Sequence, residues 1–452
     1  MGQGQHSRIT RIVAAVTPEN RHEHRLHSRV PDPATPVFGA GLSVGASSID
    51  AARAALSQAL AAIPGGRADL VFLFYTGHHT DATERIVAEA ADAASPGVLI
   101  GATMEGVIAL GSEVERAPGV SALAARMPGV RCRPFTIDDL PIASLDDPAS
   151  DEVIAHACGF DDEARATVIF TDPFSVPMLS VIGSLDRVRR DRAHGCRIVG
   201  GIASGSAVSG GNRLICNDKI LRGGLVGVTI AGDIDVTSVV SQGCRGFGPT
   251  MVITKCQNNL ILELGGRPAL TAVQEIIESL DPDSREKLRR GLFIGRVTDE
   301  YKARFGRDDF LIRNVHGADE AAGAIAVTDF FRVGQTVQLF MRDAQSAHDD
   351  LAMLLDAQAL YGTPSGVLLA SCNGRGTRLF PRPNHDAAAF AGAFGPPASG
   401  ESRAKGGVEI TTPDATFPLA GCFSAGEFGP IADRTYVHGH AACALLFRPR
   451  AT

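Results

Sequence analysis

Three short apolar runs in this chain each end in a turn of small residues. Val98–Ile100 leads into GATMEGVI, Arg197–Val199 into GGIASGSA, and Pro418–Ala420 into GCFSAGEF. The apolar runs predict buried strands, and the glycines indicate that the backbone turns sharply or approaches another group closely, since glycine has no Cβ. We therefore expect close backbone approach to shape these strand ends. The spacing of the three motifs is too irregular to predict a solenoid.

The remaining pattern alternates strands with single helices. Leu70–Tyr75 is a continuous apolar run, typical of a strand buried on both faces, and Ser48–Ile63 has the apolar spacing of a helix. Two strand pairs are expected across short turns: Val120–Met127 with Val130–Phe135, and Gly224–Ala231 with Ile234–Val240. This mixture predicts an α+β or mixed α/β fold with two packed domains, each with mixed sheets flanked by helices.

Composition excludes several classes of function. The 452 residues are 44% hydrophobic and carry a formal charge of −7, with scattered Lys and Arg, which argues against binding to nucleic acid or to an anionic membrane surface. Nine cysteines without a CxxC pair indicate reduced thiols. No apolar run approaches the roughly 20 residues that span a bilayer. We expect a cytoplasmic protein without membrane insertion.

The first 37 residues are polar after one short apolar run, and they predict a mobile arm. His22, His24 and His27 fall in this arm. They lack a cysteine or carboxylate cluster at ligand spacing, so we expect neither a metal nor a cofactor.

The segment Gly421–Ala441 lies between two predicted buried strands and concentrates small residues, one carboxylate and two histidines. One interpretation is a ligand site at the rim of a sheet, with Glu427 as the charged group. The other is a tight crossover in which Glu427 caps a turn. The ligand interpretation takes as candidates Gly421, Ser424, Gly426, Glu427 and His438.

Arginines follow several strands of the second half of the chain. Arg313, Arg342 and Arg375 lie at or beyond strand ends, where a planar guanidinium suits a carboxylate ligand. The alternative for each is structural pairing with Asp309, Asp343 or Asp386. Further candidates for the ligand site are Asp343, Cys372, His79, Glu105 and Gln242.

Cys372 supports a rival hypothesis from another class. The thiol follows a predicted strand, next to glycines and Arg375, and His385 and Asp386 come 13 and 14 residues later. A cysteine-dependent enzyme with a Cys-His-Asp arrangement is therefore an alternative. A protein-binding scaffold without a small ligand is a third.

The order of motifs resembles the FIST family of intracellular signal-transduction proteins. DFLIRN, RDA, SCNGRG with PNHDA, and GCFSAGEFGPI carry the resemblance in the second half, and GATMEGVI, VGGIASG and QGCRGFGP carry it in the first. The resemblance implies a FIST N-terminal domain (residues 38–222) and a FIST C-terminal domain (residues 223–452). It also implies a small ligand such as an amino acid. With too few preceding residues for an F-box, we expect output through a separate signalling protein.

Overall fold

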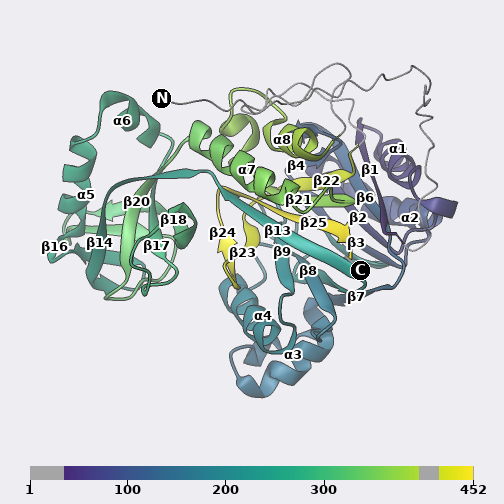
Figure 1. The fold of residues 1–452 in the computed structure, drawn as a ribbon, viewed down its shortest axis with the longest axis horizontal. Coiled ribbons are helices and arrows are strands. Elements are labelled where there is room, and N and C mark those ends of the chain that lie inside the picture. Colours follow the sequence, from purple (N-terminus) through teal and green to yellow (C-terminus); the bar gives the residue numbers. More distant parts are fainter. Residues whose placement is uncertain (1–34, 396–416, 451–452) are drawn as a thin grey trace, which may run out of the picture. The chain divides into compact units, whose positions relative to one another are not determined.

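The computed structural model describes residues 35–395 and 417–450. The predicted N-terminal arm, including His22, His24 and His27, lies outside the described residues except for residues 35–37. Within the described residues, eight α-helices and four β-sheets form the fold (Figure 1). This arrangement confirms the mixed α/β class.

Three of the sheets share one order of strands. In each, two antiparallel strands are followed by a parallel pair and then by a β-hairpin. The first sheet consists of β1 (Val37–Val44), β6 (Gly119–Arg126), β2 (Leu70–Thr76), β3 (Val98–Met104), β10 (Leu214–Cys216) and β11 (Lys219–Leu221). The second consists of β7 (Val130–Thr136), β12 (Leu225–Gly232), β8 (Ala164–Thr171), β9 (Arg197–Ile202), β23 (Glu427–Ile431) and β24 (Arg434–His438). The third consists of β13 (Ile234–Gln242), β25 (Ala441–Pro449), β21 (Gly366–Cys372), β22 (Leu419–Ser424), β4 (Gly106–Ala109) and β5 (Ser112–Glu115).

The chain is thus built from three repeats of one topology, spanning residues 37–126, 130–232 and 234–449. Each repeat gives its hairpin to another repeat. The hairpin β4–β5 of the first repeat pairs with β22 of the third, β10–β11 of the second pairs with β3 of the first, and β23–β24 of the third pairs with β9 of the second. The exchange is cyclic, because each repeat contributes one hairpin to a neighbouring sheet and its own sheet receives one hairpin.

Both expected strand pairs are wrong as pairings, although all four strands exist. β6 pairs with β1 and β2 in the first sheet, whereas β7 pairs with β12 in the second. Likewise β12 pairs with β7 and β8, whereas β13 pairs with β25 in the third sheet. The short connections after β6 and β12 carry the chain from one sheet to the next, so their glycines mark a change of repeat.

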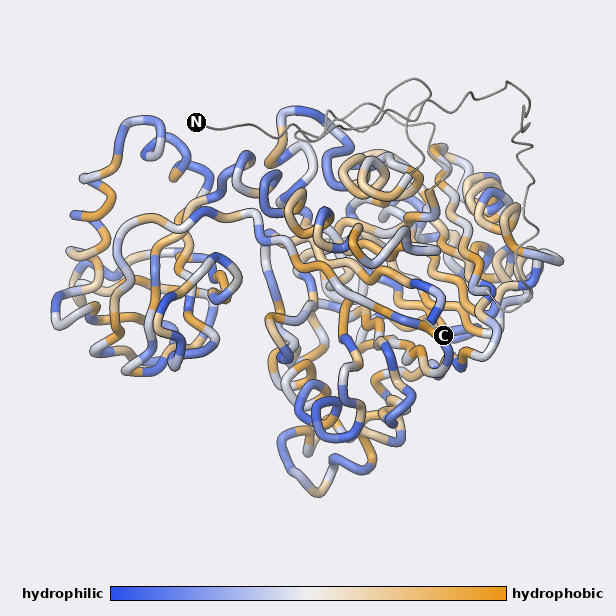
Figure 2. Tube along the Cα trace, in the orientation of Figure 1, coloured by the Kyte–Doolittle hydropathy of each residue, from blue (hydrophilic) through white to orange (hydrophobic). Residues whose placement is uncertain are grey.

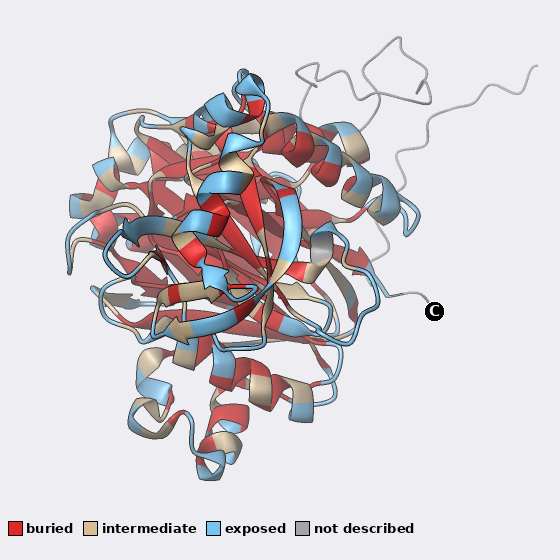
Figure 3. Ribbon diagram, turned by 90° about the vertical axis from the view of Figure 1, so that its left-hand side faces the viewer, coloured by how far each residue is buried: buried red, intermediate tan, exposed pale blue. Residues whose placement is uncertain are grey.

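Each sheet of the three repeats is covered by helices on one face and packs against a shared apolar core on the other. The helices are α1 (Ser48–Leu60) and α2 (Thr83–Ala94), α3 (Asp151–Cys158) and α4 (Met178–Arg192), and α7 (Ala344–Ala359) and α8 (His385–Phe394). Phe72, Val168 and Leu368 of the middle strands join the shared core, and their neighbours along the chain face the helices. Because both faces are covered, β2 is buried along its whole length, as predicted. Figure 2 shows apolar residues following these strands, and Figure 3 shows the strands buried between helices with exposed outer faces.

The fourth sheet interrupts the third repeat between β13 and α7. It has seven strands, in the order β14 (Cys244–Gln257), β20 (Thr336–Arg342), β17 (Leu292–Val297), β18 (Phe310–Asp319), β19 (Ala324–Val327), β15 (Leu260–Leu264) and β16 (Arg267–Pro268). Its helices are α5 (Ala269–Glu278) and α6 (Pro282–Leu288). Cys244, the first residue of β14, pairs with Arg342, the last residue of β20. The chain therefore enters and leaves this sheet next to the end of β13.

The three small-residue motifs occupy one equivalent position. Gly101, Gly200 and Gly421 lie in the middle of β3, β9 and β22. A Cβ atom on these glycines would lie 2.5, 1.8 and 1.8 Å from a carbonyl oxygen of the neighbouring parallel strand. Glycine is therefore required for this close contact. The close approach occurs in the middle of the strands and not at strand ends as expected, because β3, β9 and β22 continue past these glycines to Met104, Ile202 and Ser424.

Candidate functional site

The three repeats meet at Ser204, which follows β9 of the second repeat. Its hydroxyl group accepts a hydrogen bond from Glu105 N (2.9 Å) of the first repeat and lies 2.8 Å from Phe423 O of the third, to which it donates. The same hydroxyl lies 3.4 Å from Asn373 Oδ1, just after β21. One half-buried side chain thus joins strand ends of all three repeats.

Beside this junction lies a hollow with a cavity volume of about 10 Å³, about the space that one water molecule needs. Its lining comes from the first and third repeats and consists of Glu105, Gly106, Glu115, Asn373 and Phe423. Arg378 forms an ion pair with Glu105, and its Nη1 donates to Asn373 O (2.8 Å). The Glu105 and Arg378 side chains are 31% and 43% exposed, so this ion pair is open to solvent.

The exchanged hairpin fixes the second carboxylate of the hollow. Glu115, at the end of β5, accepts hydrogen bonds from Thr377 N (2.9 Å) and Thr377 Oγ1 (3.0 Å). Gly376 has a φ of +53°, and a Cβ there would lie 2.6 Å from Glu115 Oε1. Glycine at 376 therefore allows the 372–378 loop to close over the Glu115 carboxylate.

Arg375 turns from the same loop into the interior. The side chain is fully buried and forms a bidentate ion pair with Asp386, with Nε–Oδ2 at 2.7 Å and Nη2–Oδ1 at 2.8 Å. Asp386 also accepts a hydrogen bond from Ser371 Oγ (2.8 Å). Burial alone would raise the pKa of Asp386, but the Arg375 guanidinium and the remaining hydrogen bonds hold it well below its ordinary value. This pairing is the structural alternative that the sequence left open for Arg375.

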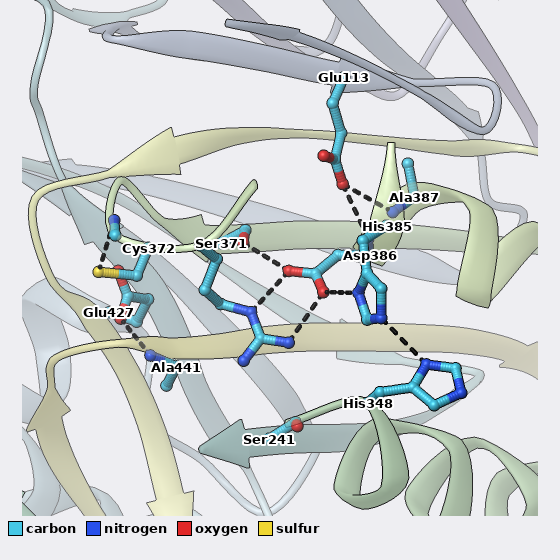
Figure 4. Close-up of polar contacts among 12 residues, drawn as sticks. Glu113, Ser241, His348, Ser371, Cys372, His385, Asp386, Ala387, Glu427 and Ala441 are labelled. Atoms are coloured by element: carbon cyan, nitrogen blue, oxygen red, sulfur yellow. Dashed lines mark hydrogen bonds and ion pairs between the residues drawn. The ribbon is translucent and has the colours of Figure 1, made fainter. Parts of the chain in front are cut away.

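The exchanged hairpin also caps α8. Glu113 Oε1, from β5, accepts hydrogen bonds from Asp386 N (2.9 Å) and Ala387 N (3.0 Å), and Asn384 Oδ1 in turn accepts from Glu113 N (2.7 Å). A carboxyl group at a helix N-terminus satisfies amides that have no intrahelical partner. Burial and the nearby Asp386 raise the pKa of Glu113 to about 8. Figure 4 shows Glu113 above Asp386 and Ala387.

His385 extends the buried network toward α7. Its Nδ1 lies 2.9 Å from Asp386 Oδ1 and its Nε2 lies 3.0 Å from His348 Nδ1, while its ring stacks on Phe380. His385 and Asp386 therefore contact each other, as the Cys-His-Asp alternative requires. The partners of Cys372, however, lie on another strand.

Cys372 pairs with Glu427. The Glu427 carboxyl group is fully buried and accepts hydrogen bonds from Ser424 Oγ (2.8 Å), from Ala441 N (3.2 Å) and from the thiol of Cys372. Figure 4 shows the hydrogen bond from Ala441 and the Cys372 sulfur next to this carboxyl group. Burial raises the pKa of Glu427 to about 8, although these hydrogen bonds oppose the rise. Burial also raises the pKa of the Cys372 thiol, and the adjacent carboxyl group raises it further. A thiol held in its protonated form is a poor nucleophile.

Arg342, at the end of β20, reaches the same loop. Its Nη2 donates to Gly374 O, and not to Asp343, the structural partner expected for it. Asp343 instead caps α7 through Ser346 N (3.0 Å) and pairs with Lys287. Burial alone would raise the pKa of Asp343, but Lys287 and Ser346 lower it to about 2.

Arg313 and His438 lie next to each other on β18 and β24. Arg313 pairs with Asp329 (2.8 Å), not with Asp309, and donates to Val437 O (3.0 Å). His438 is buried with Nε2 3.0 Å from Gly429 O, and burial lowers its pKa to about 4. Both residues therefore have structural partners.

The remaining candidates are spread over the fold. His79 is buried beyond β2 with Nδ1 2.9 Å from Ser48 Oγ, and Gln242 Nε2 donates to Phe310 O (3.0 Å). Gly426 packs against Ile202, where a Cβ would lie 2.7 Å from Cδ1. The structure thus gathers Arg342, Cys372, Arg375, Ser424 and Glu427 near one strand end and places Glu105 at the adjacent hollow.

The residues that complete the hollow were not among the predicted site residues. Arg378 follows the SCNGRG motif by two residues, and Ser204 lies inside the GGIASG motif, so both were close to recognised signals. Glu115 reaches the hollow only through the exchange of the β4–β5 hairpin, and nothing in its sequence neighbourhood indicates that exchange.

Comparison with protein families gives two matches along this chain. The FIST N domain matches residues 69–267, and the FIST C domain matches residues 269–430. FIST domains are associated with sensory signal transduction. The two matches meet between residues 267 and 269, and the domain ranges 38–222 and 223–452 stay a prediction.

Relatives of similar length occur in mycobacteria. An uncharacterized protein of Mycobacterium tuberculosis H37Rv is 35% identical over 413 residues, which cover 91% of this chain and 99% of that protein. An uncharacterized protein of Mycobacterium bovis is 34% identical over 413 residues, covering 91% and 98%. Among solved structures, a cyanuric acid hydrolase from A. caulinodans aligns with 10% identity and a TM-score of 0.28, covering 92% of this chain and all of that one. A chorismatase aligns with 9% identity and a TM-score of 0.29, covering 91% and 99%.

Proposed function

The chain belongs to the FIST family, and on that premise we propose that it is a sensory protein that binds a small ligand such as an amino acid. We place the ligand in the hollow at the junction of the three repeats. The observation that carries this proposal is the pairing of opposite charges at the hollow: Glu105 and Glu115 on its lining supply carboxylates, and Arg378, which is paired with Glu105, supplies a guanidinium. An amino acid carries the complementary ammonium and carboxylate groups.

The Glu105–Arg378 ion pair is suited to being opened by a ligand. An ion pair this exposed contributes only about 0–1 kcal/mol, so separating its members costs little. A ligand ammonium group between Glu105 and Glu115 and a ligand carboxylate on Arg378 would replace one pair by two charge-assisted contacts. Such contacts contribute about 1.5–3 kcal/mol each before the costs of association.

The size of the hollow limits the ligand. Its cavity volume of about 10 Å³ is that of about one water molecule, far below the roughly 300–1,000 Å³ typical of pockets for drug-sized molecules. We therefore expect the Glu105–Arg378 ion pair to separate before a ligand enters. We also expect a ligand of a few heavy atoms, with Phe423 providing the apolar surface and Asn373 a neutral hydrogen-bonding group.

Signal output is proposed to run through the 372–378 loop to a separate signalling protein. Asn373 lines the hollow and its carbonyl group accepts from Arg378, while Cys372 and Arg375 of the same loop hold the buried contacts to Glu427 and Asp386. A ligand that shifts this loop would act on a network of buried charges. We place this sensor in the cytoplasm; its nine cysteines are free thiols. No helix among residues 35–395 and 417–450 is long and apolar enough to span a bilayer.

A thermal-shift screen of the twenty amino acids tests the proposal. A ligand present at 100 times its dissociation constant adds about 2.7 kcal/mol of stability. We expect one or a few amino acids to raise the Tm of the wild type and to have a much smaller effect on Glu105→Gln. If no amino acid stabilises the wild type, or if Glu105→Gln responds equally, the proposal is wrong.

A further inference from the structure

A second group of charged side chains gathers around the backbone of two glycines. A Cβ atom built on Gly374 would lie 2.8 Å from His440 Nδ1 and 3.5 Å from Arg342 Nη2, and one built on Gly243 would lie 3.3 Å from Arg375 Nη1. Gly243 N also donates to His440 O (3.0 Å). The end of β20, the loop after β21 and the turn before β25 therefore bring two guanidinium groups and one imidazole together.

Several polar atoms of this group have no partner. Arg342 Nε, Arg375 Nη1 and His440 Nδ1 are buried and make no hydrogen bond to the described residues. The Arg375 side chain is 0% exposed, so bulk water does not reach its free nitrogen. His440 Nε2 lies 3.3 Å from Asn314 Oδ1, to which it donates, so Nδ1 of this imidazole is an acceptor and only the two guanidinium atoms are unfilled donors. Because nearly all buried polar atoms in folded proteins are hydrogen-bonded, these unfilled guanidinium donors indicate a missing acceptor.

The charges around Arg342 point to the same conclusion. Asp386 balances the charge of Arg375, whereas the hydrogen bond of Arg342 runs to a neutral carbonyl group. Burial lowers the pKa of Arg342, and the Arg290 and Arg375 guanidinium groups lower it further. An anion next to Arg342 would offset this excess of positive charge.

We propose that Arg342 and Arg375 form a second binding site, which takes a small anion of carboxylate size through Arg342 Nε and Arg375 Nη1. Guanidinium N–H groups suit a planar carboxylate, with which they form short charge-assisted hydrogen bonds. The side chains approach the two glycine backbones closely, which limits the occupant to an ion such as formate or to the terminal carboxylate of a larger ligand.

This site is distinct from the amino-acid hollow, although both use the 372–378 loop. Asn373 lines the hollow, and its neighbour Gly374 contacts Arg342 and His440. An anion held beside Gly374 would fix this part of the loop, so its occupancy would adjust the ligand response of the hollow.

The experiment is thermal unfolding of the full-length protein in sodium formate, titrated against benzenesulfonate, a bulky anion without a carboxylate group, at constant ionic strength. We expect formate to raise the Tm of the wild type in a saturable manner, by about 2–4 °C. Arg342→Gln should lose the effect. The control Arg267→Gln removes a surface arginine of the same inserted sheet, 53% exposed and paired with Glu275, and should keep it.

Two further arms complete the test. If glycine competes with formate, the occupant is the carboxylate of a larger ligand, and if it does not, the occupant is a free anion; either result supports the site. Bromide soaked into wild-type crystals should give an anomalous peak between Arg342 and Arg375, and this measurement needs no variant to fold. An absent peak together with equal formate and benzenesulfonate curves would overturn the proposal, whatever the outcome at Glu105.

Discussion

Glu427 holds in the third repeat the position that Leu214 holds in the second. Each is the first residue of its exchanged hairpin. Glu427 pairs with Gly201 and Leu214 pairs with Ala102, and these two partners occupy equivalent positions in their sheets. In the first repeat the position belongs to Val107, opposite Cys422. The fold therefore accepts an apolar side chain here, and the buried carboxyl group beside Cys372 is a specific property of the third repeat.

The carboxyl group of Glu427 should make stability depend on pH. Its pKa is raised by burial from 4.5 to about 8, so its contribution is complete below about pH 4.5 and is lost as pH rises through 8. Glu427→Gln cannot ionise, so its free energy of unfolding should exceed that of the wild type by on the order of 3 kcal/mol above pH 8. The two proteins should converge near pH 5. Urea denaturation from pH 5 to 9 measures the difference; Glu113, which also has a pKa of about 8, is present in both proteins and cancels. Parallel curves would contradict a buried, protonated Glu427.

The Arg375–Asp386 ion pair should be a major stability determinant of the third repeat. Asp386→Asn leaves a fully buried guanidinium without its counter-charge and should cost about 3–5 kcal/mol. Glu275→Gln, which breaks the exposed ion pair to Arg267, should cost less than about 1 kcal/mol. Equal losses in guanidinium chloride denaturation would show that Arg375 is solvated.

Cys372 should resist alkylation in the native protein. Burial and Glu427 raise the pKa of its thiol, and the residue is buried, whereas Cys256 is partly exposed. Iodoacetamide at pH 7.5 followed by mass spectrometry should label Cys256 first and Cys372 only after unfolding. Rapid native labelling of Cys372 would revive the hypothesis of a cysteine-dependent enzyme.

Gly421 and Gly439, which precede and follow β23–β24 in the chain, offer a matched pair of glycine-to-alanine substitutions. Gly421→Ala would place a Cβ 1.8 Å from Leu369 O, whereas an added Cβ on Gly439 meets nothing within 4 Å. We expect Gly421→Ala to destabilise the protein by about 1–3 kcal/mol or more, and Gly439→Ala to be nearly neutral. Thermal denaturation of both variants measures this, and similar Tm values would remove the close-contact explanation.

The sequence predicted the strands of this fold better than their partners. Leu70–Tyr75 and the three small-residue motifs correspond to strands, because burial on both faces leaves a plain apolar signal. The repeats themselves were not recognised. The fourth sheet interrupts the third repeat, so the spacing of Gly101, Gly200 and Gly421 is uneven. Turn signals at Pro128-Gly129 and Gly232-Asp233 also look the same whether the chain folds back or enters another sheet.

The candidate site was predictable only where its residues share a strand end. Cys372 and Arg375 lie close together in the sequence, and Glu105 lies within the recognisable motif GATMEGVI. Glu115 and Ser204 join them through hairpin exchange and through the meeting of three repeats. These relationships are set by tertiary packing, on which local sequence patterns carry no information.

The central claim is that the hollow binds a ligand with an ammonium and a carboxylate group. Isothermal titration calorimetry of the amino acid selected by the thermal-shift screen tests it most directly, with the wild type, Glu105→Gln and Arg378→Gln. Each variant removes one charge that contacts the ligand, so each should bind about tenfold to a hundredfold more weakly. Arg267→Gln should bind as the wild type does. Equal affinities for all four proteins would contradict a ligand in the hollow between Glu105, Glu115 and Arg378.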